Sequence, residues 1–279
     1  MTVCITVLAS LVALAAAVRS TWSPCGLSML STITPLGERA KGHAYPATAG
    51  WFVLGSTIGG VALGALTALM AGGVRSLQAS STALGTAALC AAVVAAGSDA
   101  GVFGFRIPIH RRQVNERWLD QYRPWVYAGG FGWQIGTGLF TYITTAAVYL
   151  MIVLAALTAD PVTAFVLGTC FGLLRGLAVL LTRHLTTPAA LLTFHRRFAA
   201  AGPWVGRAVT AAEVAASAVL VVLLWSPVAL GVVGAAACLA TFRFVHARWR
   251  EAHRPAGHPV AGDRPLPAGA PVPAGADRR

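Results

Sequence analysis

The chain repeats part of its own sequence, and this internal echo is the feature that most constrains its fold. The segment Pro46–Ser56, PATAGWFVLGS, returns as Pro161–Thr169, PVTAFVLGT, with a Gly-Trp pair missing from the second copy. A weaker echo, in residues 22–34 and again in 133–144, precedes each copy. Both strong copies open long apolar segments. The sequence therefore predicts a membrane protein built from two related halves.

The composition agrees with a membrane location. Hydrophobic residues make up 56% of the chain and charged residues 11%, with a mean hydropathy of +0.68, whereas soluble domains carry about 25% charged residues. The net charge of +12 comes from arginines that lie between the apolar stretches, where the positive-inside rule places them. The expected partner is therefore the lipid bilayer, and no nucleic-acid partner is expected.

Apolar stretches near the length that crosses a bilayer predict an all-α, polytopic transmembrane helical bundle. The first stretch is too long for one straight crossing and contains Pro24, which predicts a broken or strongly tilted helix. The last two stretches share one apolar block, so the bundle has six or seven spans. The predicted spans cover 3–34, 47–71, 79–98, 130–156, 161–182, 207–225 and 227–243.

The basic residues predict the orientation of these spans. With the arginine-rich connections in the cytoplasm, Arg75 alone falls in an outer loop, which puts the N-terminus outside and the C-terminus inside. The Ala-, Gly- and Arg-rich composition suits a bacterial plasma membrane. The two echoed spans then cross in opposite directions, which predicts two inverted three-helix repeats. Such repeats commonly bind substrates or ions near the midplane of the membrane.

This topology divides the chain into five parts. A cytoplasmic interfacial segment, rich in arginine and aromatic residues, separates the two repeats, and a disordered Pro-rich tail follows an extra C-terminal span. The predicted boundaries are 1–103 for the first repeat, 104–129 for the interfacial segment, 130–225 for the second repeat, 226–254 for the extra span and 255–279 for the tail.

Five cysteines lie in apolar segments without a CxxC pair or a metal-like cluster. This odd count argues against a disulfide framework, and neither a metal nor a cofactor is expected. Cys25 differs from the others because it follows Pro24 at the predicted helix break. A thiol there is reactive if a cation lies near it, and Arg19 reaches it only through the break. The alternative is that Cys25 is a packing residue beside a structural kink.

The segment Ser23–Leu30, SPCGLSML, together with Pro35 and the two inverted three-helix halves, resembles the membrane domain of the CcdA/DsbD thiol-redox family of cytochrome c biogenesis. That family lies within a wider group containing LysE-type exporters. The resemblance implies one redox cysteine in the first helix, Cys25, a second in the fourth, and an extracytoplasmic thioredoxin-like partner. The fourth span of this chain has no cysteine, and Gly136 or Thr137 stands there instead. A substitute thiol would come from Cys170 or Cys90.

Charged residues inside the spans are the other candidates for function. Arg19, Arg175 and Glu213 lie within predicted spans, where charge is costly and marks a pathway or an internal ion pair. An Arg175–Glu213 pair is compatible with the predicted depths, whereas Arg19 can also snorkel to the membrane surface. Asp99 is predicted to lie at the membrane interface.

Small residues mark one face of the second span and its counterpart in the fifth. Close helix packing is the favoured interpretation of these faces. The alternative is that hydroxyls, including those of Thr57 and Thr169, line a polar passage. The residues concerned are Gly55, Ser56, Thr57, Gly59 and Gly60 in the second span and Gly168, Thr169 and Gly172 in the fifth.

Three functions fit these features. The first is a transporter that moves a small solute by alternating access, with Arg19, Arg175 and the Pro24 break lining its site. The second is a thiol-redox protein that uses Cys25. The third is a membrane scaffold without transport. No hydrolase, kinase or nucleotide-binding motif is present, so the chain is not expected to be an enzyme unless it is a thiol-disulfide oxidoreductase.

Overall fold

The computed structural model describes residues 2–102, 122–141, 143–224, 230–236, 238–239 and 243, and every regular element among them is helical. Most of the predicted interfacial segment, part of the predicted seventh span and the whole tail lie outside the described residues. Within them, five helices are long and apolar enough to cross a membrane: Val3–Ser20, Tyr45–Ser76, Ser81–Asp99, Pro161–Thr182 and Pro188–Leu224.

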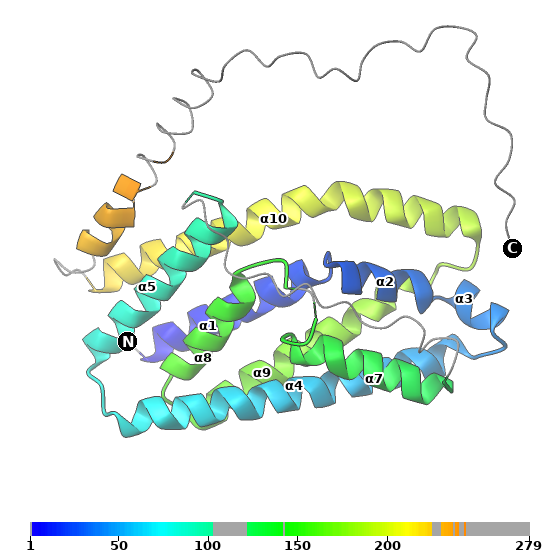
Figure 1. The fold of residues 1–279 in the computed structure, drawn as a ribbon, viewed down its shortest axis with the longest axis horizontal. Coiled ribbons are helices and arrows are strands. Elements are labelled where there is room, and N and C mark those ends of the chain that lie inside the picture. Colours follow the sequence, from blue (N-terminus) through cyan, green and yellow to red (C-terminus); the bar gives the residue numbers. More distant parts are fainter. Residues whose placement is uncertain are drawn as a thin grey trace, which may run out of the picture.

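The first predicted span is broken, which confirms the expectation from Pro24. Helix α1 (Thr2–Ser20) ends, three residues turn, and α2 (Pro24–Thr32) begins with Pro24 in its first turn. The Ser23 hydroxyl accepts a hydrogen bond from the Gly26 amide at 3.1 Å and caps α2. A short α3 (Pro35–Ala40) follows, so that α1, α2 and α3 form a line across the molecule (Figure 1).

The fourth predicted span, 130–156, is also broken, and here the prediction of one continuous helix is wrong. Helix α7 (Pro124–Thr137) stops at Gly138, which adopts the left-handed conformation with φ 69°, and α8 begins only at Ala147 and runs to Leu157. Asp99, at the end of α5 (Ser81–Asp99), stabilises the segment between α7 and α8. Its carboxylate accepts hydrogen bonds from the Ala146 amide (2.8 Å) and the Thr145 hydroxyl.

Helices α4 (Tyr45–Ser76) and α9 (Pro161–Leu177) pack against each other through small residues. A Cβ atom placed on Gly60 would lie 2.8 Å from the Gly172 Cα. The Ser56 hydroxyl donates to the Gly172 carbonyl at 2.7 Å, and Thr67 donates to the Ala164 carbonyl at 2.9 Å. Residue numbers rise on one helix as they fall on the other, so the two helices are antiparallel. Close packing of these faces is confirmed.

Helix α7 also packs against the small residues of α4, and the two helices run parallel. Gly55 meets the Gly129 carbonyl, and four residues later Gly59 meets the Trp133 carbonyl. Helix α7 therefore runs parallel to α4 and antiparallel to α9. Which ends face the cytoplasm stays a prediction.

Helix α10 (Pro188–Leu224) is much longer than the predicted span 207–225 and lies on the opposite side of the bundle from α4 (Figure 1). Its 37 residues extend over about 55 Å at 1.5 Å per residue. Inward-facing Val209, Glu213, Ala216 and Leu220 form a buried stripe at helical spacing. A 3₁₀ segment, η1 (Ala178–Thr182), continues α9.

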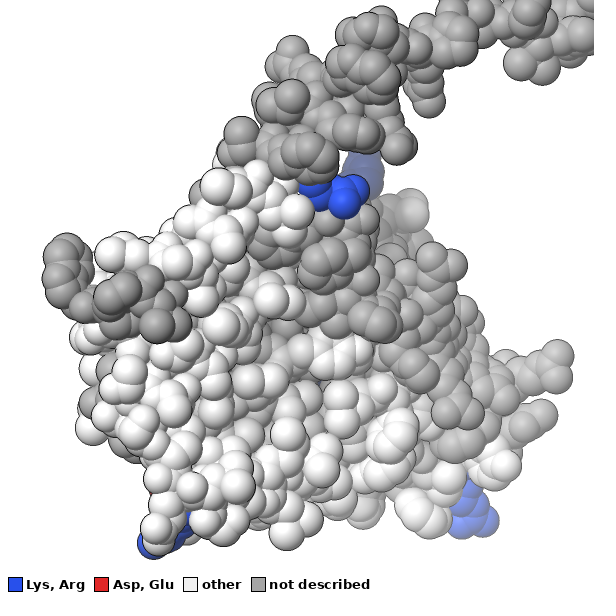
Figure 2. Space-filling model, turned by 60° about the vertical axis from the view of Figure 1, so that its left-hand side comes forward, with Lys and Arg blue, Asp and Glu red and all other residues white. Residues whose placement is uncertain are grey.

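The outer surface is apolar, as a bilayer requires. On α1, one face exposes large hydrophobic side chains at helical spacing: Val3, Val7, Leu11, Leu14 and Val18. On the face shown in Figure 2, the described surface is almost free of charge, and the Lys and Arg patches lie at its edges. By helix length and composition, the chain is a multi-pass membrane protein.

Trp22, in the first helix break, packs against α10, so its truncation should lower the free energy of unfolding. Its ring stacks on Phe198 with centroids 4.3 Å apart, and its indole N–H donates to the Phe198 carbonyl at 2.7 Å. We expect Trp22→Ala to lower the free energy of unfolding by about 3 kcal/mol and Trp22→Phe by about 1 kcal/mol. Thermal unfolding in detergent measures both. Trp204→Ala is the control, because Trp204 is exposed; an equal loss in that variant would contradict the assignment.

Candidate thiol–guanidinium site and adjoining cleft

The structure places Cys25 and Arg175 in one buried site. Cys25 lies in the first turn of α2 and is 2% exposed, and Arg175 lies near the end of α9 and is 3% exposed. The two side chains interact electrostatically. Helix α2 packs against η1, the segment that continues α9, and this contact brings the thiol and the guanidinium together.

The end of α7 closes the site on another side. The Arg175 guanidinium lies over the Phe171 ring, 5.5 Å from its centroid, which is a cation–π arrangement. A Cβ atom on Gly138 would lie 2.8 Å from the Phe171 ring and 3.5 Å from Nη1 of Arg175. Both breaks therefore place a residue next to Arg175. Cys25 comes directly after the first break, and Gly138 lies at the second.

The Arg175–Glu213 pair that the predicted depths allow is not formed among the described residues. Neither carboxylate oxygen of Glu213 has a hydrogen-bond partner, and no ion pair joins it to Arg175 within the described residues. The reason is geometric: Arg175 faces α2 and the end of α7, whereas Glu213 lies on α10, which packs on α1 and α5. Similar depth in a membrane does not put two side chains on facing helices.

The other predicted site residues lie apart from this site or bond within their own helices. Cys170 and Cys90 are exposed, and all five cysteines are thiols. The Thr57 hydroxyl donates to the Val53 carbonyl and that of Thr169 to the Phe165 carbonyl, each at 2.9 Å. Their roles in a pathway stay predictions.

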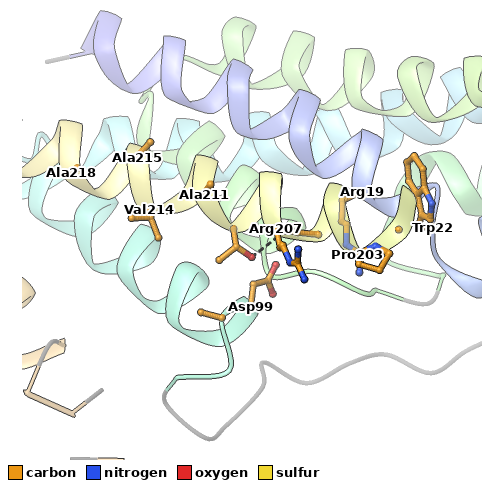
Figure 3. A pocket seen from close by; sticks show the side chains of 13 residues that line it. Arg19, Trp22, Asp99, Pro203, Arg207, Ala211, Val214, Ala215 and Ala218 are labelled. Carbon is orange, nitrogen blue, oxygen red and sulfur yellow. Dashed lines mark hydrogen bonds between the residues drawn. The ribbon is translucent and has the colours of Figure 1, made fainter. Parts of the chain in front are cut away.

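Arg19 lines a cleft of about 970 Å³. The cleft opens between α1, the end of α5 and α10, and it also holds Asp99 and Arg207. Figure 3 shows the Asp99 carboxylate and the Arg207 guanidinium pointing toward each other. Apolar residues of α10, Val214, Ala215 and Ala218, continue the lining.

A buried carboxylate network near the start of α4 was not predicted from the sequence. Glu38, on α3, is fully buried and accepts hydrogen bonds from the Tyr127 hydroxyl (2.9 and 2.8 Å) and the Thr48 hydroxyl (2.6 Å). His43 Nδ1 lies 3.8 Å from its Oε2. Burial, and then the bonds to Glu38, raise the pKa of Tyr127, so this phenol stays a donor at neutral pH.

One sequence signal does point to this network. The echoed P-x-T-A motif contains Thr48 in its first copy and Thr163 in its second, and each hydroxyl donates to a preceding acidic residue, Glu38 and Asp160 respectively. Paired threonines in a repeated motif indicate a shared local role. Among the described residues, no group of three His, Cys, Asp or Glu side chains is arranged to hold a metal.

Comparison with known proteins identifies distant relatives. The chain is 35% identical to the methylamine utilization protein MauF of Paracoccus versutus over 176 residues, 61% of this chain and 62% of that protein. It is 32% identical to MauF of Paracoccus denitrificans over 60% of each chain. MauF of Methylobacillus flagellatus is 34% identical over 60% of this chain and 59% of its own.

These matches relate the chain to MauF without extending over the whole of either protein. The chain spans about three-fifths of the length of the curated relatives it matches. No protein-family model matches it, and no solved structure matches it significantly.

Proposed function

We propose that this membrane protein related to MauF carries out thiol-disulfide exchange through Cys25. The observation that carries the proposal is the buried Cys25–Arg175 pair, formed where the two broken spans meet. A thiolate is the nucleophile in disulfide exchange, and a neighbouring cation stabilises it. A buried guanidinium that faces a thiol rather than a carboxylate suits this task.

The exchange needs a second protein, because the fourth span supplies no thiol. The Cys25 sulfur, after losing its proton, attacks a disulfide of the partner; the partner's S–S bond breaks, a mixed disulfide forms, and the second sulfur leaves as a thiolate. A thiol of a thioredoxin-like protein then attacks the mixed disulfide. This attack falls on the partner's sulfur, so Cys25 leaves as a thiolate stabilised by Arg175 and the partner becomes bonded to the thioredoxin-like protein. A second thiol of the thioredoxin-like protein then attacks this new disulfide, so that the partner leaves with two thiols and the thioredoxin-like protein keeps an internal disulfide bond. Because Cys25 is 2% exposed, α2 must move away from η1 for attack.

The process that the protein serves, its repeat architecture and its orientation in the membrane are parts of the same proposal. The names of the relatives favour methylamine utilization as the process served. The antiparallel α4–α9 packing and the break in both the first and the fourth span support two inverted repeats. We place the N-terminus outside and the C-terminus in the cytoplasm of a bacterial plasma membrane.

In-cell alkylation trapping tests the proposal. Cells are quenched with acid, and the thiols are modified with a maleimide reagent that shifts the mobility of the chain. We expect part of the Cys25 population to be protected as a mixed disulfide that disappears on reduction and in Cys25→Ala. Arg175→Met should lower the protected fraction, because this variant removes the cation beside Cys25.

Two controls decide the result. Cys170→Ala removes an exposed thiol and should leave the protected band unchanged, whereas its loss would make Cys170 the partner thiol. A folded chain in which Cys25 stays reduced under oxidising and reducing growth conditions alike would overturn the proposal.

Solute transport is the second candidate, and the charged cleft between α1, α5 and α10 favours it. Broken helices near the midplane are typical of transporter sites, and Arg19 lines the cleft beside the first break. Uptake of labelled methylammonium into proteoliposomes, compared with Arg19→Gln, tests this candidate. A chain that shows neither thiol exchange nor flux would be a scaffold.

A further inference from the structure

Glu213 is a buried carboxyl group that lacks a hydrogen-bond partner. Its side chain is 1% exposed, and both of its oxygens are unsatisfied among the described residues. Its neighbours along the inward stripe of α10 are Val209, Ala216 and Leu220, which belong to the main hydrophobic core. Helix α10 thus presents one acidic side chain to an apolar interior.

An ionised carboxylate is not stable in such a place. The cost of moving an unpaired charge from water into an apolar interior is at least several kcal/mol, and a group in that position becomes neutral instead. Proteins retain ionisable groups in membrane interiors mainly for function. Glu213 therefore needs a bound positive charge, and the smallest one is a proton.

Asp99 provides a second, differently placed carboxylate. It lies against the same turn of α10, because it shares the cleft lining with Thr210, Ala211 and Val214. Its two oxygens accept hydrogen bonds from the Ala146 amide and the Thr145 hydroxyl. Asp99 interacts electrostatically with Glu213. A negative neighbour favours the protonated form of Glu213.

Few other charges act on this pair. Helix α1 contributes Arg19, which interacts electrostatically with Asp99, and α10 itself contributes Arg207, which faces Asp99 across the cleft (Figure 3). The remaining titratable side chains on α1 and α5 are the thiols of Cys4 and Cys90. Both arginines lie on the cleft side, where they counterbalance Asp99, and among the described residues no cation is paired with Glu213.

We propose that Glu213 is a proton-binding site in the membrane interior and that Asp99, at the wall of the cleft, is the group through which this site meets water. The reaction is the transfer of one proton between the cleft and the Glu213 carboxylate. This inference does not depend on thiol exchange at Cys25, since the two sites lie on different helices.

Carbodiimide labelling of the full chain in nanodiscs tests the proposal, because dicyclohexylcarbodiimide reacts with protonated carboxyl groups in apolar surroundings. We expect an adduct on the peptide that contains Glu213, abundant at low pH and decreasing as the pH rises. Glu213→Gln should abolish it. Asp99→Asn should move the decrease to lower pH, with a loss of labelling of up to about tenfold for each pH unit of the shift.

Ser217→Ala is the matched control, because Ser217 lies one turn further along the inward stripe and its hydroxyl bonds only to the Glu213 carbonyl in its own helix. It should label like the original chain. Infrared difference spectra provide a second readout: a protonated-carboxyl C=O band should vanish in Glu213→Gln. A Glu213 that stays ionised at every pH would overturn the proposal. Labelling that Na⁺ suppresses at constant pH would also overturn it, by assigning the site to a metal cation.

Discussion

Replacing Gly172 with leucine is expected to abolish the folded bundle. A Cβ atom on residue 172 would lie 2.4 Å from the Gly60 Cα and 2.6 Å from the Ser56 carbonyl oxygen. All of these are backbone atoms, so the clash cannot be relieved by turning a side chain. Overpacking a core costs about 1–3 kcal/mol when side chains can adjust, and here α4 and α9 must separate. We expect a loss of more than about 3 kcal/mol.

The same helix pair supplies a matched control. Gly73, near the end of α4, has open space around it, because a Cβ atom at this residue would have no neighbouring atom within 4 Å. Gly73→Leu also replaces a poor helix former by a good one. Monodisperse yield and thermal unfolding in detergent should therefore be unchanged or improved for Gly73→Leu and lost for Gly172→Leu. Gly172→Ala should lie between them. Similar behaviour of the two leucine variants would refute the close packing of α4 on α9.

The sequence was sufficient to predict features that depend on local pattern. Apolar length identified the helices, Pro24 located the first break, and the glycine spacing in the two echoed spans predicted their close approach. The antiparallel relation of those spans followed from the distribution of arginines, which reflects membrane insertion rather than folding. The helices, the first break and the glycine faces are each marked by residues close together in the chain.

Features that depend on which helix faces which were not predictable. Arg175 and Glu213 have matching predicted depths but face different helices. The second break has no proline to mark it; it depends on Gly138 and on Asp99, which reaches the start of α8 from another helix. A single sequence without contact information cannot distinguish a carboxylate that caps a neighbouring helix from one that lies at the membrane interface.

Replacing Glu38 with alanine is the second large effect that we expect. This change removes the acceptor of the Tyr127 and Thr48 hydroxyls and leaves both donors buried, since each of the three side chains is fully buried. Hydrogen bonds to a charged group contribute about 1.5–3 kcal/mol each. The free energy of unfolding should fall by about 3–5 kcal/mol, measured by thermal and denaturant unfolding in detergent.

Conservative variants separate the network from simple loss of volume. Glu38→Gln keeps one carbonyl acceptor and should cost about half as much as Glu38→Ala. Tyr127→Phe removes one donor, so in a double-mutant cycle with Glu38→Ala the two losses should add up to more than the loss in the double variant. Asp160→Ala is the matched control, because Asp160 accepts from the second P-x-T-A threonine at the start of α9; the loss of this helix cap should cost less than Glu38→Ala. Equal losses for Glu38→Ala and Asp160→Ala would mean that Glu38 acts only as a local cap and does not join α3 to α4 and α7.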